Sequence, residues 1–299
     1  MKLIEGGLLS TALAILILFH TSLGQSESIT DRHPFLVFDA TGYSNKPDLS
    51  EHGIRSIGLA YTAEFGADWY RHSDKLPDPQ AVRSIAARKA QEKTGLVILD
   101  IEHWPLNGPV EQVGASLTKY MTVLKWFRDA APGVALGYYG TPPIRDYGRA
   151  ILDTSSPGRQ AWMEENDQIR SLSNAVDVLF PSLYTFSSDR VGWKKYAIAQ
   201  IEEARRSAGG KPVYVFLWPQ YHPGNLSLGE KYLAADHWLL ELETARAYAD
   251  GLVIWGGWDL RNNAPLPWDD NAPWWRVTKE FLTTFDRTPP APPTIIAVF

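Results

Sequence analysis

The sequence has 299 residues, of which 44% are hydrophobic and 21% charged, and these values exclude a mainly disordered or collagen-like chain. The 29 basic and 34 acidic residues give a formal net charge of −5, which argues against a surface built for nucleic acid or anionic lipid. Cysteine is absent, so disulfides, thiolate metal sites and cysteine nucleophiles are excluded, while 12 Trp, 13 Tyr and 11 Phe make the chain rich in aromatic residues.

The N-terminus has the three-part pattern of a cleavable secretory signal. Lys2 is followed by an apolar run over residues 8–19, and small residues close the segment at Gly24. The run is shorter than the roughly 20 apolar residues that cross a membrane. We therefore predict a signal peptide over residues 1–24 and a secreted or periplasmic protein that has no membrane association after cleavage. Because Glu5 weakens the basic start, an uncleaved anchor is the alternative.

Short apolar runs alternate with polar loops and amphipathic stretches through the rest of the chain. Some runs, such as residues 251–255, are apolar on both faces, as parallel strands covered by helices are. This alternation predicts an α/β protein, and seven units favour an irregular, TIM-like parallel (β/α) barrel over an open sheet. Strands are predicted at 35–38, 54–61, 96–101, 134–139, 176–183, 213–217 and 252–255, and helices at 79–93, 113–130, 190–208 and 231–249.

The pattern predicts one catalytic barrel domain over residues 25–285, followed by an extended Pro-rich tail over 286–299. No glycine-rich phosphate loop follows a predicted strand, so a nucleotide-binding sheet has no support. We expect a monomer without a metal or cofactor, because no metal-ligand spacing is visible. His103 and His222 lie at predicted strand ends, where each either lines a cleft or makes hydrogen bonds within a loop.

The ends of the predicted strands carry carboxylates and aromatic rings. In a parallel barrel these ends surround the active site. Such a rim suits a polysaccharide or oligosaccharide substrate, because sugar hydroxyls need hydrogen bonds and the apolar sugar faces pack on flat rings. The candidate substrate-binding residues are Asp39, Trp104, Tyr139, Tyr184, Trp218, Tyr221, Trp255 and Trp258.

Asp100 and Glu102 form the sharpest pattern, because they follow an all-apolar run and stand two residues apart. Residues two apart in a strand point to the same side, so both carboxyls are expected in the barrel mouth while Ile101 packs behind them. Two neighbouring carboxylates do not ionise together cheaply, so one is expected to have a raised pKa and hold its proton. That group supplies the general acid that glycoside cleavage needs. The alternative is a strand end that runs into a polar loop, with Asp100 as a local cap.

Four segments resemble the hyaluronidase family of glycoside hydrolases, family 56, in order and approximate spacing. Leu99-Asp-Ile-Glu-His-Trp-Pro is similar to that family's Asp-Trp-Glu-Glu-Trp-Arg-Pro. Leu136-Gly-Tyr-Tyr-Gly-Thr-Pro is similar to its fourth-strand segment, Leu179-Phe-Pro-Ser-Leu-Tyr to its Tyr-Pro-Ser-Ile-Tyr, and Gly251-Leu-Val-Ile-Trp-Gly to its Gly-Val-Val-Leu-Trp. The seven predicted strands also match the irregular barrel of that family.

The resemblance implies a retaining mechanism on an N-acetylhexosaminide. The acetamido oxygen of the sugar attacks the anomeric carbon, so no enzyme nucleophile is needed. Glu102 would be the acid and later the base, and Asp100 would orient and stabilise the acetamido group. Tyr184 would hydrogen-bond to that group, and Trp255 would form the wall beneath it.

The sequence also departs from this family. Its Asn at the end of the first strand is Asp39 here, the Trp between its acids is Ile101, the Glu after its acid is His103, and the Arg before Pro105 is missing. At the family's second acetamido-binding Tyr, Phe216 is nearest in register, which leaves Trp218 or Tyr221 to substitute. The family's disulfides are absent, and a chain of net charge −5 is a doubtful partner for a polyanion such as hyaluronan.

Two other functions stay open on the sequence alone. The first is a glycosidase on the same barrel that uses two separated carboxylates, with Asp39 or Asp259 as the nucleophile, on sugars that lack the acetamido group. The second is a non-catalytic carbohydrate-binding protein that keeps the aromatic cleft.

Overall fold

The computed structural model describes residues 34–66, 69 and 74–285. The predicted signal peptide over 1–24 and the predicted tail over 286–299 lie outside these residues, so both stay predictions. Among the described residues, none of the helices has the length and apolar character that a membrane crossing requires.

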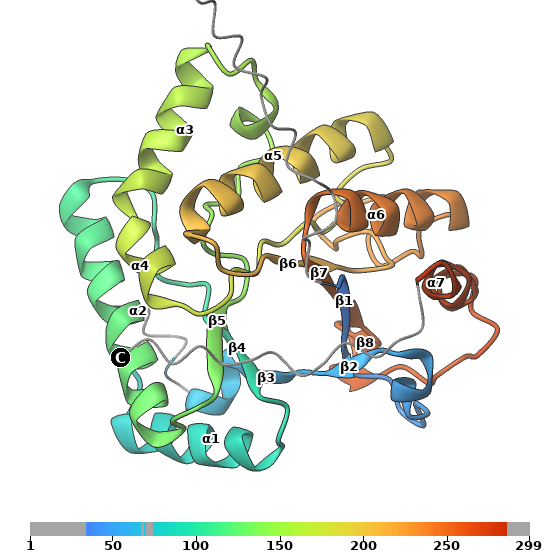
Figure 1. Ribbon diagram of the computed structural model, residues 1–299, viewed down its shortest axis with the longest axis horizontal. Helices are drawn as coiled ribbons and strands as arrows, with labels where there is room; N and C mark the ends of the chain where they lie inside the picture. Colours follow the sequence, from blue (N-terminus) through green and yellow to red (C-terminus); the bar gives the residue numbers. More distant parts are fainter. Residues whose placement is uncertain (1–33, 67–68, 70–73, 286–299) are drawn as a thin grey trace, which may run out of the picture. The chain divides into compact units, whose positions relative to one another are not determined.

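Parallel strands with helices around them make up the described chain (Figure 1). The strands are β1 (Leu36–Thr41), β2 (Arg55–Ser56), β3 (Gly58–Tyr61), β4 (Leu96–Asp100), β5 (Ala135–Tyr138), β6 (Tyr214–Leu217), β7 (Gly251–Gly256), β8 (Trp258–Asp259) and β9 (Ala264–Pro265). One parallel sheet has the order β2-β1-β7-β6 and a second the order β3-β4-β5, while β8 and β9 form an antiparallel pair. The predicted α/β class is confirmed.

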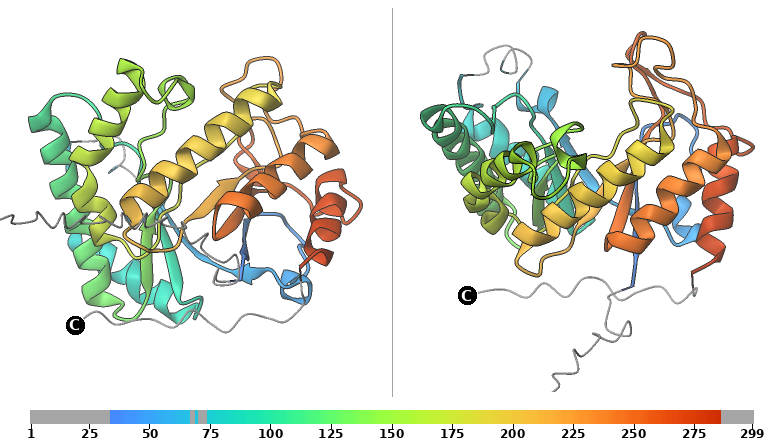
Figure 2. Two further views of the ribbon diagram at one scale, coloured as in Figure 1. Left: turned by 45° about the horizontal axis from the view of Figure 1, so that its top comes forward. Right: turned by 90° about the horizontal axis from the view of Figure 1, so that it is seen from above.

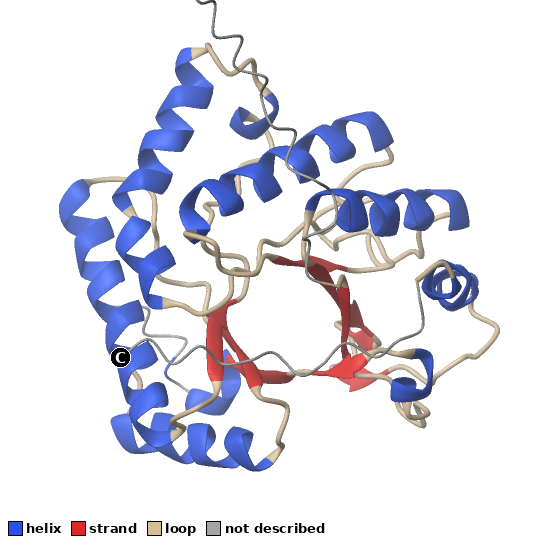
Figure 3. Ribbon diagram, viewed as in Figure 1, coloured by secondary structure: helices blue, strands red, loops and turns tan. Residues whose placement is uncertain are grey.

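The helices follow one another around the outside of the sheets (Figures 2 and 3). They are α1 (Pro79–Gln91), α2 (Val110–Ala130), α3 (Pro157–Gln168), α4 (Arg170–Ala175), α5 (Arg190–Ala208), α6 (Ala235–Tyr248) and α7 (Pro273–Thr283). Contacts run from α1 to α2, then to α4, α5, α6 and α7. The prediction for α5 is confirmed at both ends, because the Asp189 side chain caps its start and Gly209, in the left-handed conformation, ends it.

The predicted strand over 176–183 is broken into isolated parallel bridges. These bridges pair Phe180 with Tyr139, Leu179 with Val213, and Ser182 with Phe216. The segment therefore still lies between β5 and β6 and connects them. Pro181 has no N–H to give to a ladder, which explains why no continuous strand forms.

Alternate residues of the strands face two separate apolar clusters. In β4, Leu96 and Ile98 belong to an inner cluster, and Val97 and Leu99 to an outer cluster beneath the helices. This follows from the two-residue period of a strand. The parity of a strand-end residue therefore decides whether its side chain reaches the inner face or the helix layer.

A carboxyl group is fully buried behind the strand ends. The Glu241 side chain of α6 is 0% exposed, and its Oε1 accepts a hydrogen bond from the Thr185 hydroxyl. Nε2 of His237 lies 3.6 Å from the same oxygen. Burial raises the pKa of Glu241 well above its ordinary value, although the Thr185 hydrogen bond opposes this, and burial lowers the pKa of His237. Burial therefore favours the uncharged form of Glu241 in the folded protein.

We expect Glu241→Gln to keep nearly the full free energy of unfolding at pH 7, because an uncharged amide oxygen can still accept from Thr185. Glu241→Ala should lose about 2–4 kcal/mol, since it leaves a cavity and an unpaired buried hydroxyl. Because the pKa of Glu241 is raised in the folded state, the free energy of unfolding of the wild type should fall as the pH rises. The Gln variant has no ionisable group at this position and should not show this fall. Urea unfolding from pH 5 to 9 measures both; a large loss in the Gln variant at pH 7 would contradict the neutral state.

Candidate active site

Asp100 and Glu102 lie on the same side of the chain at the end of β4. Both line an open pocket of about 180 Å³, while Ile101 between them is 0% exposed and belongs to the outer cluster. The backbone here is held by hydrogen bonds to two carbonyls: the Tyr120 hydroxyl donates to Ile101 O at 3.2 Å, and the Thr62 hydroxyl donates to Asp100 O. The structure thus brings the two acids together as the two-residue spacing predicts.

The two carboxyls have different surroundings. Burial, and secondly the charge of Glu102, raises the pKa of Asp100 from its ordinary value of 3.8 to about 7. The Glu102 side chain is 47% exposed, and its Oε2 lies 3.2 Å from Nη2 of Arg145. The sequence predicts a raised pKa for one of the pair, and Asp100 is the residue whose burial raises its pKa.

Aromatic rings form one wall of the pocket. The rings of Trp218 and Trp255 meet edge to face at 4.8 Å, and the Tyr184 ring lies 5.5 Å from Trp218 and 5.8 Å from Trp255. Nε1 of Trp255 donates to the Tyr61 hydroxyl at 3.3 Å, which ties the wall to the end of β3. Flat rings in such an arrangement offer the stacking surface that a sugar face needs.

Buried tyrosine hydroxyl groups lie at this wall, where the Tyr139 ring is 5.8 Å from that of Tyr184. The hydroxyls of Tyr139 and Ser182 share a hydrogen bond of 3.0 Å, and the Tyr139 ring meets Phe216 edge to face at 4.8 Å. Burial raises the pKa of Tyr139 and of Tyr184, so both hydroxyls stay protonated and can donate hydrogen bonds. Phe216, which is nearest in register to the second acetamido-binding Tyr of the hyaluronidase family, also lines the pocket and brings no hydroxyl there.

The structure brings six of the predicted residues to this pocket and leaves four outside it. The six that line it are Asp100, Glu102, Tyr139, Tyr184, Trp218 and Trp255. The four that do not are Asp39, Trp104, Tyr221 and Trp258.

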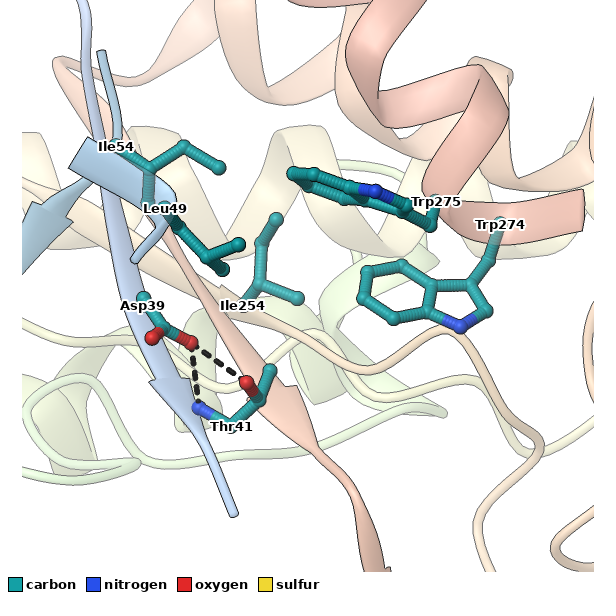
Figure 4. Close-up of a pocket in the computed structure, with 7 residues that line it drawn as sticks. All are labelled: Asp39, Thr41, Leu49, Ile54, Ile254, Trp274 and Trp275. Carbon is teal, nitrogen blue, oxygen red and sulfur yellow. Dashed lines mark hydrogen bonds between the residues drawn. The ribbon is translucent and has the colours of Figure 1, made fainter. Parts of the chain in front are cut away.

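Asp39 faces the helix layer instead of the pocket (Figure 4). Its neighbours Phe38 and Ala40 face the inner cluster, so the alternation of β1 turns Asp39 outward, where it lines a narrow space beside Trp274. Its carboxylate pairs with Nζ of Lys46 at 2.5 Å and accepts from the Thr41 backbone N–H at 2.9 Å. The prediction of a substrate contact at Asp39 is therefore corrected: this carboxylate is a local structural group.

The other three residues are engaged elsewhere. Trp104 is 1% exposed and packs edge to face on Tyr120 in the outer cluster. Tyr221 is also buried in that cluster, with His237 as a neighbouring ring, and Nε1 of Trp258 donates to Asn263 at 3.2 Å. The predicted substrate contacts of Trp104 and Tyr221, which are buried in the outer cluster, are corrected in the same way as that of Asp39. Trp258 is half-buried and does not line this pocket, and its substrate contact stays a prediction.

Several pocket residues were not among the predicted site residues. They are Leu59, Tyr61, Phe216, Pro223 and Leu260, with Arg145 against Glu102. His222, for which lining a cleft was one of two predicted roles, also lines the pocket. Tyr61 is the last residue of a predicted strand and pairs in register with Asp100, so the strand-end rule applied to the strand itself could have found it. Arg145 comes from the loop after β5, and nothing in its local sequence signals the contact. Among the described residues there is no group of three or more acidic or His side chains that could hold a metal ion.

Comparisons with known proteins agree with this architecture. No protein-family model matches the sequence, and no curated protein does. Bee venom hyaluronidase is similar in structure, with a TM-score of 0.60 and 18% identity over 84% of this chain and 97% of that chain. A GH18 chitinase from Pseudoalteromonas aurantia has a TM-score of 0.47 and 12% identity, over 78% of each chain. An endo-1,4-beta-D-mannanase from Thermotoga petrophila has a TM-score of 0.46 and 11% identity, over 84% of this chain and all of that one.

The structural similarity to bee venom hyaluronidase can be compared with the resemblance to the hyaluronidase family in four sequence segments. At 18% identity it is a likeness of fold, and it extends over almost the whole of the hyaluronidase chain. The likeness of fold to hyaluronidase that the sequence segments indicate is confirmed.

Proposed function

We propose that this protein is a secreted glycoside hydrolase that cleaves a polysaccharide containing N-acetylhexosamine by a retaining, substrate-assisted mechanism. The observation that carries this function is the pair Asp100 and Glu102, which share one pocket, differ in burial and face an aromatic wall. Glycoside cleavage needs a proton donor for the leaving oxygen and a group that stabilises the positive charge on the sugar. The two carboxyls are suited to these two tasks.

We infer that the two parallel sheets belong to one irregular, seven-stranded barrel. β2 and β3 are consecutive in the chain and are separated only by Ile57, which links the sheets on one side. The bridges of residues 179–182 to Tyr139 and Phe216 link β5 to β6 on the other. In such a barrel the carboxyl ends of the strands surround the site, and the positions of Asp100 and Trp255 near the ends of β4 and β7 support this arrangement.

The proposed reaction uses one proton shared by the acid pair. Transfer of this proton from Asp100 to Glu102 leaves Asp100 charged, and the half-exposed Glu102 can then protonate the leaving oxygen. The glycosidic bond breaks as the acetamido oxygen bonds to the anomeric carbon. The resulting oxazolinium ion is positive, and the buried Asp100 carboxylate stabilises it. Water then attacks the same carbon and gives its proton to Glu102.

The remaining pocket residues would hold the sugar for this attack. The Tyr184 hydroxyl would donate a hydrogen bond to the acetamido group, and Trp255 would pack against its methyl. These roles follow the resemblance, and the ring contact of 5.8 Å between the two residues supports them, because one bound group can touch both.

The two-carboxylate alternative has no observation in its favour. Asp39 faces away from the pocket. Asp259 does not line it, and its carboxylate accepts hydrogen bonds from the backbone N–H groups of Arg261 and Asn262. A second, separated carboxylate for a two-carboxylate mechanism is therefore not found among the residues that line the pocket.

The test is the release of reducing ends by the purified protein, at mildly acidic pH, from hyaluronan, chondroitin, chitin oligomers and bacterial N-acetylhexosamine exopolysaccharides. We expect product from at least one of these polymers and none from a matched oligosaccharide without the acetamido group. Equal cleavage of both would support the two-carboxylate mechanism. Binding of oligosaccharide without any product would support a carbohydrate-binding protein, and either result would overturn the proposed function.

A further inference from the structure

His222 is held rigidly at the edge of the pocket. It lines the same cavity as Asp100 and Glu102. Its backbone N–H donates to Thr185 O at 2.8 Å, and its ring stacks on Phe186 with centroids 4.1 Å apart and planes 26° from parallel. A ring fixed at both its backbone and its face presents its nitrogens in one orientation.

The hydrogen bond at Nδ1 sets the tautomer of this ring. The backbone N–H of Gly224 donates to Nδ1 of His222 at 3.0 Å, so we assign Nδ1 as an unprotonated acceptor. A neutral imidazole that accepts at Nδ1 carries its proton on Nε2. Burial, and secondly the charge of Arg145, lowers the pKa of His222, which favours this neutral form. His222 therefore offers one N–H donor.

The Nε2–H group is free to meet a ligand. Among the described residues none accepts a hydrogen bond from it, and the ring centroid lies 6.2 Å from that of Trp218 and 6.4 Å from that of Tyr184. Two other histidines differ, since Nε2 of His103 and of His237 is buried without a partner and neither residue lines the pocket. His222 thus combines a fixed ring, a defined donor and a place beside the aromatic wall.

We propose that His222 is a specificity-determining residue whose Nε2–H donates a hydrogen bond to an uncharged oxygen of the bound sugar chain, a hydroxyl or an acetamido carbonyl. This role rests on the proposed function, since it requires a saccharide in the pocket. A neutral donor suits a neutral acceptor, because it gives direction to the contact without requiring a charge on the sugar. His222 would then select the sugar by the position of one acceptor oxygen beside Trp218 and Tyr184.

Two substitutions separate the donor from the ring. His222→Phe keeps a flat ring on Phe186 and removes the donor, and His222→Gln places an amide N–H near the position of Nε2. We expect KM for the cleaved oligosaccharide to rise about three- to tenfold in the Phe variant, the range for loss of one neutral hydrogen bond, with kcat within about twofold of wild type. The Gln variant should recover most of the affinity. His52→Phe, at an exposed position outside the pocket, is the matched control.

Binding and spectroscopy complete the test. Oligosaccharide binding, followed by tryptophan fluorescence in a Glu102→Gln background, should weaken by the same factor in the Phe variant. The ¹⁵N NMR shifts of the His222 ring should show a proton on Nε2 and should move when chitin oligomers bind. If the wild type cleaves but KM and binding are unchanged in the Phe variant, or the proton is on Nδ1, this role is overturned while the proposed function stands. A wild type that neither binds nor cleaves any oligosaccharide overturns both.

Discussion

Glu102→Gln is expected to abolish turnover, with kcat falling roughly 10²–10⁴-fold, which is the range for loss of a general acid and base. The amide has nearly the same shape but can neither give a proton to the leaving oxygen nor take one from water. The fold should not suffer, because the side chain is 47% exposed and its ion pair is the contact with Arg145 at 3.2 Å. Reducing-end release measures the activity, and the midpoint of thermal unfolding measures the fold.

A matched control separates the loss of this acid from a general effect of charge. Glu111→Gln removes a carboxylate at an exposed position in the first turn of α2, outside the residues that line the pocket, and should leave kcat unchanged. The Glu102→Gln variant should still bind oligosaccharide, since binding uses the aromatic wall. Activity near that of the wild type in Glu102→Gln would remove Glu102 from the mechanism.

The parts of the site that could be predicted from the sequence are those set by local periodicity. The two-residue period of a strand places Asp100 and Glu102 on one side with Ile101 behind, and the structure has the same arrangement. The same period also explains the error at Asp39. A residue at the end of a strand can face either side of the sheet, and its position alone does not show which. In β1 the side chains of Phe38 and Ala40 face the inner cluster, so that of Asp39 faces the helices.

Other features depend on tertiary packing and have no local signal. Arg145 reaches Glu102 from the loop after β5, at a distance of 43 residues along the chain. The raised pKa of Asp100 comes mainly from its burial, and burial is a property of the whole fold. The break at Pro181 could have been expected, because proline cannot donate to a ladder, yet the segment keeps its place between its neighbours through single bridges.

Asp100→Asn is expected to lower kcat by roughly 10²–10³-fold, the range for loss of one electrostatic contact to a charged intermediate. The amide keeps the size of the carboxylic acid but cannot become an anion when the oxazolinium ion forms. Binding of a thiazoline analogue of that ion should weaken by a comparable factor, whereas binding of intact substrate should change little. Equal effects on analogue and substrate would instead mean that Asp100 acts in general binding.

Asp100→Asn is expected to lower kcat but to raise stability above pH 7. This combination separates a catalytic role of Asp100 from a structural one. The pKa of Asp100 is raised from 3.8 to about 7 in the folded protein, so its contribution to stability is fully present below the ordinary pKa and is lost as the pH rises through about 7. Asn carries no charge at any pH, so Asp100→Asn should unfold at a higher temperature than the wild type above pH 7 and at a similar temperature near pH 4. A wild type that gains stability from pH 4 to 8, relative to this variant, would contradict the raised pKa. Ionisation of the buried Asp100 carboxyl is unfavourable in the resting protein and is useful only when the positive intermediate is bound. A carboxyl that serves the reaction through its charge should therefore, when replaced by Asn, give lower activity together with higher stability.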